Sequence, residues 1–217
     1  MQSRPAQAYT SFTSAKAKAL RIKSNWFKEG REHSPQVISD ALSFVVSRIA
    51  DNALKNTRKS KFEIELGPQY FDFLAEFLLF LILSADRIAY LRFSAEDRGI
   101  FTGNLANRVG ETYAENRSRL LEADLKDCKQ RFIDLLNQRA GEYADFGYDE
   151  NGPDYGFYRY LAFCIGNVLS EEDANWVIDP MISFEAPEAI KMVEKTLRGL
   201  YEEEPKKPRR RAAGGGD

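Results

Sequence analysis

The chain has 217 residues, of which 43% are hydrophobic and 29% charged, a composition that excludes an intrinsically disordered chain and suits one globular domain. Both cysteines, Cys128 and Cys164, occur within apolar helical patterns, which argues against a disulfide framework and favours a reducing compartment. The net charge of −2 conceals a segregation: residues 1–61 contain 12 Lys/Arg and 4 Asp/Glu, whereas residues 62–201 contain 14 and 25.

Basic residues are concentrated at the N-terminus. Residues 1–28 contain six Lys or Arg, no Asp or Glu, and no continuous apolar segment of the kind that a secretory signal requires. We expect a flexible N-terminus over 1–14 and a basic helix over 15–29. A cytoplasmic location is favoured, with organelle targeting as the alternative because transit peptides have a similar composition. The positive charge is compatible with a nucleic acid or an anionic membrane surface as partner, and more simply with packing of this segment on the acidic remainder of the chain.

The next element is a helix that begins at a clear signal. Ser34 suits the N-cap and Pro35 the first helical position. Apolar residues recur on one face, at Ile38, Leu42, Val45 and Ile49. Residues 57–67 then alternate between apolar and charged side chains and form the only plausible strand, although a loop or a helix lead-in fits them equally well.

Residues 71–93, "FDFLAEFLLFLILSADRIAYLRF", are the most apolar stretch of the chain and belong to a predicted helix over 68–92. The part without charges covers only residues 77–85, about 14 Å of helix, which is half of what a membrane span needs. We therefore expect no transmembrane segment. The pattern instead predicts a central helix that is buried on most of its circumference.

The polar side chains of this helix fall on one side of a helical projection, in a stripe about 100° wide. We call these residues the polar stripe: Asp72, Glu76, Asp86, Arg87 and Tyr90. Three interpretations are open. The carboxylates can form structural ion pairs, for which Arg87, Arg98 and Arg108 are candidate partners. The stripe can form a partner interface through Leu79 and Leu83, or a carboxylate site that binds Mg²⁺. The single histidine, His33, excludes a di-iron centre.

Helical periodicity continues to residue 201. Residues 94–113 carry apolar side chains at steps of four, and residues 121–135 show the alternating steps of a bundle seam. A helix from 157 to 168 is followed by a short one that Ser170 caps and that ends at Asp179–Pro180, and the last begins near Pro187. The sequence thus predicts an all-α fold: a single-domain bundle of about seven helices, over residues 15–201, around the central helix 68–92.

Seven aromatic residues occur between positions 143 and 160, interleaved with glycines and acidic residues. Side chains that combine area with a hydroxyl are favoured at recognition surfaces. The candidates for a ligand or partner surface are Tyr148, Asp149, Tyr155, Phe157 and Tyr158. The other interpretation is a turn whose aromatic side chains fold back onto the end of the bundle. The segment "DENGPD" does not fit the register of a helix–loop–helix calcium site.

The tail, residues 202–217, consists of charge runs, proline and small residues, and we expect it to be disordered. No catalytic residue, metal site or cofactor fingerprint can be identified in the chain. The sequence favours a soluble intracellular protein that binds a protein partner or forms a homo-oligomer, as an adaptor, a chaperone-like protein or a structural protein. The alternatives are a helical-bundle enzyme that uses the carboxylates of the polar stripe, and polyanion binding through the basic N-terminal segment.

Overall fold

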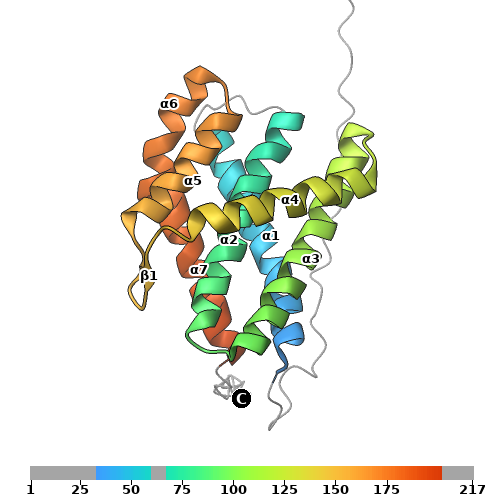
Figure 1. Cartoon of the computed structure of the whole chain (residues 1–217). Coiled ribbons are helices and arrows are strands. Elements are labelled where there is room, and N and C mark those ends of the chain that lie inside the picture. Colours follow the sequence, from blue (N-terminus) through green and yellow to red (C-terminus); the bar gives the residue numbers. More distant parts are fainter. Residues whose placement is uncertain (1–32, 60–66, 202–217) are drawn as a thin grey trace, which may run out of the picture. The chain divides into compact units, whose positions relative to one another are not determined.

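Helices make up most of the computed structural model, which describes residues 33–59 and 67–201 (Figure 1). The helices are α1 (Pro35–Lys59), α2 (Pro68–Tyr90), α3 (Ala95–Leu121), α4 (Leu125–Tyr143), α5 (Tyr155–Val168), α6 (Glu171–Pro180), the π-helix η1 (Met181–Glu185) and α7 (Ala186–Tyr201). The two strands β1 (Tyr148–Asp149) and β2 (Gly152–Pro153) pair antiparallel in one hairpin. The prediction of an all-α fold is confirmed.

Several predicted segments fall outside the described residues. They are the flexible N-terminus 1–14, the basic helix 15–29 and the charged tail 202–217. The predicted strand 57–67 is only partly covered: α1 includes residues 57–59, and residues 60–66 are not described. Within the described residues, no helix is long and apolar enough to cross a membrane.

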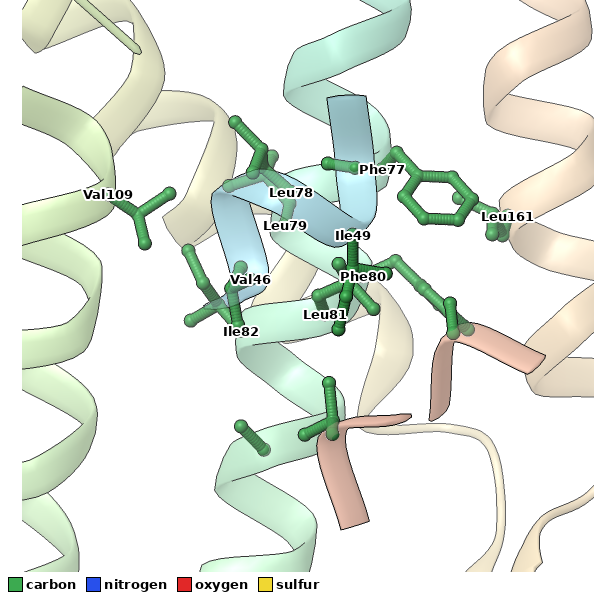
Figure 2. Packing of buried hydrophobic residues seen from close by; sticks show 14 of the residues in the cluster. Val46, Ile49, Phe77, Leu78, Leu79, Phe80, Leu81, Ile82, Val109 and Leu161 are labelled. Atoms are coloured by element: carbon green, nitrogen blue, oxygen red, sulfur yellow. The ribbon is translucent and has the colours of Figure 1, made fainter. Parts of the chain in front are cut away.

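The centre of the bundle is α2, which contacts α1, α3, α4, α5 and α7 (Figure 1). Pro68 starts the helix, and its apolar residues are then buried on nearly every side, as in Figure 2, where the side chains of residues 77–82 lie among others from α1, α3 and α5. Leu79 is fully buried. A partner interface through this leucine, one of the three interpretations of the stripe, is therefore wrong, because Leu79 packs inside the bundle. Leu83 is half-buried, and the stripe reaches solvent at Tyr90, which is 65% exposed.

Local signals set the starts of four helices. The side chains of Ser94, Asp124, Asp154 and Ser170 each accept a hydrogen bond from the backbone N–H three residues later. Each cap satisfies an N–H group that has no partner inside its own helix, which contributes about 1 kcal/mol. The cap at Ser170 was predicted. Cys128 and Cys164 are free thiols and both are buried, as their apolar surroundings indicated.

The chain does not break between the last two predicted helices. It passes from α6 through η1 into α7 without interruption, so the described residues contain seven α-helices in six continuous helical segments. The spacing of the buried residues follows the change in helix type. Val177 and Met181 are four residues apart, and the next buried residue, Ala186, follows after five. Pro180 lacks the N–H that an α-helical bond requires, and the wider π turn keeps the seam against the bundle.

Candidate functional site

Glu76, the most deeply buried carboxylate of the polar stripe, is bound by an arginine. It is 4% exposed, and both of its oxygens accept hydrogen bonds from Arg139 of α4, from Nε at 2.8 Å and from Nη2 at 2.6 Å. Arg139 also donates to Glu142 at 2.6 Å. The hydrogen bonds with Glu76 raise the pKa of Arg139 further above its usual value. This carboxylate therefore carries a structural ion pair and has no oxygen without a partner.

Asp86, near the other end of α2, is held by two side chains of α3. Arg98 Nε donates to Oδ1 at 2.9 Å, and its terminal nitrogen donates to the second oxygen. Thr102 donates its hydroxyl to Oδ1 at 2.6 Å. Arg98 also lies over the ring of Tyr90, at 5.0 Å from the centroid. Arg98 was one of the predicted partners, and these contacts join α2 to α3.

The third carboxylate of the stripe, Asp72, is paired with Arg117 of α3 at 3.0 Å. This arginine was not among the predicted partners. Arg108, which was, binds Asp40 of α1 instead, at 2.9 Å. Arg87 donates a hydrogen bond to the Tyr143 carbonyl at 3.2 Å. Each carboxylate of the polar stripe is thus bound by a different arginine from a later helix.

A groove of about 390 Å³ lies against one end of the polar stripe. Its polar lining consists of Asp72, Glu76, Tyr113, Arg131, Asp134 and Gln138. Asp86 does not line this groove, and along α2 it lies about 21 Å from Asp72. The arrangement expected of a carboxylate enzyme, with all three carboxylates and Arg87 around one pocket, does not occur here. Among residues 33–59 and 67–201, no group of three or more His, Cys, Asp or Glu could hold a metal ion.

The aromatic loop packs mostly inward. Phe157 is fully buried, with its ring 4.6 Å from that of Tyr143 and 5.5 Å from that of Phe80. Its assignment to a partner surface is therefore wrong, because the first turn of α5 directs this side chain into the core. Tyr148 and Tyr158 are half-buried, and burial raises the pKa of both hydroxyls.

Two members of the predicted loop surface remain accessible. Tyr155 is 66% exposed and Asp149 is exposed. The loop itself is rigidly built: Asp154 accepts hydrogen bonds from the N–H groups of Gly147 and Phe157, at 2.7 and 2.8 Å. A role of these residues in binding stays a prediction.

A different surface presents larger apolar side chains to solvent. Trp176 of α6 is 71% exposed and Phe184 of η1 is 63% exposed. They lie eight residues apart, with the exposed Pro180 halfway between. A continuous α-helix would rotate Phe184 by about 80° from Trp176, and the wider turn of η1 reduces that angle, so the three share one side. We call Trp176, Pro180 and Phe184 the Trp176 face.

The sequence did not identify the Trp176 face, although it contained a signal. Residues 170–190 contain six acidic residues and no Lys or Arg. An aromatic residue in so acidic a segment can lie on a binding surface, but Val177 and Ile178 beside it fit a buried side equally well, so the signal is weak. The segment was interpreted only as a capped helix.

Glu185, the residue after Phe184, is expected to make the stability of the protein depend on pH. Partial burial raises the pKa of this carboxyl above its usual value, while a hydrogen bond from Asn56 at 3.5 Å opposes the shift. With a higher pKa in the folded state, the native protein binds the proton more tightly, so ionisation costs stability as the pH rises through that pKa. We expect Glu185→Gln to increase the free energy of unfolding at pH 7 by less than about 1 kcal/mol, which raises the melting temperature slightly. Near pH 4, where the wild-type carboxyl is protonated as well, we expect the two proteins to have the same stability. Thermal melts of both proteins between pH 4 and pH 7 measure this difference. A difference in melting temperature that did not change with pH would contradict a raised pKa of Glu185.

Comparisons with models of protein families, with curated protein sequences and with solved structures found no significant match to this chain. The inference of a function therefore depends on the side chains described above.

Proposed function

We propose that this chain is a soluble intracellular protein that works by binding another protein through the Trp176 face. Such a role covers an adaptor, a chaperone-like protein or a structural protein. The exposure of Trp176 carries the proposal. Tryptophan is highly buried on average in folded proteins, and it is the residue type most enriched at the energetic centres of protein interfaces. Phe184 extends the same apolar surface along the helix.

The ion pairs of the polar stripe favour this role over catalysis. A general acid, a general base or a ligand for Mg²⁺ needs a carboxylate that can reach substrate or metal. Here both oxygens of Glu76 are bound by Arg139, and both oxygens of Asp86 by Arg98.

The groove lined by Asp72 and Glu76 is the one observation that favours the carboxylate enzyme, which remains the second candidate. Polyanion binding depends on residues 1–61, more than half of which lie outside the described residues.

Site-specific photo-crosslinking tests the proposal. The probe is p-benzoylphenylalanine, introduced in place of Phe184 in one protein and of Phe44 in another. Phe44 is a matched control because it is 59% exposed and lies on α1, 12 residues or about 18 Å along the helix from Asn56, the α1 residue that contacts Glu185. We expect a discrete crosslinked protein from position 184 and none from position 44, and we expect Trp176→Ser to remove it.

The outcomes of the crosslinking separate the candidates. The same crosslinks from both positions, or a crosslink from 184 that Trp176→Ser leaves unchanged, would contradict an interface on this face. A crosslink of the chain to itself would identify the structural, homo-oligomeric form of the role. Circular dichroism of each variant shows that the fold is retained.

A further inference from the structure

We infer that the Trp176 face binds a positively charged amphipathic segment of its partner, an inference that rests on the proposed function and adds the chemistry of the occupant. Trp176 and Phe184 provide the apolar centre. The surrounding segment 170–190 is uniformly acidic, with no Lys or Arg. An interface selects partners by complementary charge around an apolar centre.

The acidic residues of α6 differ from those of α2 in how they are paired. Every carboxylate of the polar stripe is bound by an arginine. By contrast, Glu171 and Asp179 are exposed, and neither forms an ion pair with any Lys or Arg in the described part of the chain. Their charges are therefore available to a partner.

Helix stability accounts for only part of this charge. Glu171 lies in the first turn of α6, where a negative charge interacts favourably with the helix dipole. Asp179 lies where α6 continues directly into η1, so it neither caps a helix nor faces a helix N-terminus. It immediately precedes Pro180 on the Trp176 face. A carboxylate at this position complements a cation that approaches the apolar surface.

The aromatic side chain favours the same kind of ligand. The face of an indole ring attracts Lys and Arg more strongly than any other aromatic side chain does. A partner segment with apolar residues on one side and Lys or Arg beside them would use both properties: its apolar side chains cover Phe184, and its cations meet Trp176 and Asp179. The α6 helix packs mainly on α5, continues into η1, and lies at the edge of the bundle (Figure 1).

Fluorescence can report on this face directly. Trp26 and Trp176 are the two tryptophans of the chain, so Trp26→Phe leaves Trp176 as the single reporter. We would titrate this protein with a synthetic amphipathic peptide of leucine and lysine, about 18 residues long so that it can form a helix. The control peptide has glutamate at every lysine position. We expect the lysine peptide to shift the Trp176 emission and the glutamate peptide to leave it unchanged.

Matched variants locate the charge. Glu171→Gln with Asp179→Asn should weaken binding of the lysine peptide by about threefold to tenfold, the effect of losing two exposed ion pairs. Glu115→Gln with Glu150→Gln removes two exposed charges elsewhere on the molecule and should leave the affinity unchanged. Raising the salt concentration should weaken the interaction, because exposed charges are screened.

The results distinguish this inference from the proposed function. Equal binding of both peptides, or no response to either, would overturn the basic partner, while the crosslink from position 184 would still support a protein interface. An affinity unchanged by Glu171→Gln with Asp179→Asn would overturn it as well. If the Trp176 emission changed with protein concentration in the absence of peptide, a second copy of the chain would be the occupant and the inference would be wrong.

Discussion

Replacing Arg139 with methionine is expected to lower the free energy of unfolding by about 3–5 kcal/mol. The change removes both hydrogen bonds to Glu76 and leaves a carboxylate, 4% exposed, without a compensating charge in the centre of the bundle. Urea denaturation followed by circular dichroism measures the loss. The other partner of Arg139, Glu142, is half-buried, so water can solvate it after the substitution.

The double variant Glu76→Met with Arg139→Met separates the cost of an unpaired charge from the contribution of the pair. Two methionines fill similar space without charge, and we expect them to restore most of the lost stability. Lys191→Met is the control for an exposed pair, since Lys191 binds Glu188 at 2.8 Å on the surface of α7 and should contribute less than about 1 kcal/mol. If Arg139→Met cost no more than Lys191→Met, the buried pair would not have the role assigned to it.

Among the arginine partners of the polar stripe, the sequence predicted the one that a short connection between two helices brings close. It missed the two whose positions depend on how distant helices pack. Arg98 is 12 residues from Asp86, across the short connection between α2 and α3, so its position follows from the helix boundaries alone. Arg117 and Arg139 are 45 and 63 residues from their partners. Their contacts depend on the tilt and rotation of α3 and α4 against α2, which periodicity does not specify.

The same limit explains why the Trp176 face was missed. The ten residues of α6 have apolar side chains on several sides, at Ala174, Trp176, Val177 and Ile178. Only one of these sides can pack on the bundle, and a short helix gives too few turns to identify it from the sequence. The structure buries Val177 and leaves Trp176 exposed. The long apolar run of α2 carried no such ambiguity, because nearly every side of that helix is apolar.

The π-helix shows a third kind of limit. Pro180 and Pro187 were interpreted as marking the end of one helix and the start of another, which is the usual meaning of proline in a helical pattern. The boundaries are close to the observed ones, but the chain accommodates Pro180 by widening one turn instead of breaking. This wider turn keeps Phe184 on the same side as Trp176, so it affects the candidate surface directly.

Phe80→Ala is expected to destabilise the protein by about 3–5 kcal/mol. Phe80 is fully buried in α2, and its ring lies 5.5 Å from that of Phe157 and 6.3 Å from that of Tyr143, at the point where α4 and α5 meet the central helix. Alanine leaves a cavity that these two rings cannot close, because each is held by its own helix. Urea denaturation measures the change.

Phe184→Ala makes the same chemical change on the Trp176 face and should alter the free energy of unfolding by no more than about 0.5 kcal/mol, because this side chain is already mostly in water. Binding should show the opposite order: Phe184→Ala weakens the interaction with a partner, and Phe80→Ala, studied below its melting temperature, leaves it intact. If Phe184→Ala destabilised the protein as much as Phe80→Ala, Phe184 would be a packing residue. The Trp176 face would then stabilise the fold and would not be a binding surface. Separate effects on stability and on binding are what a surface kept for a partner requires.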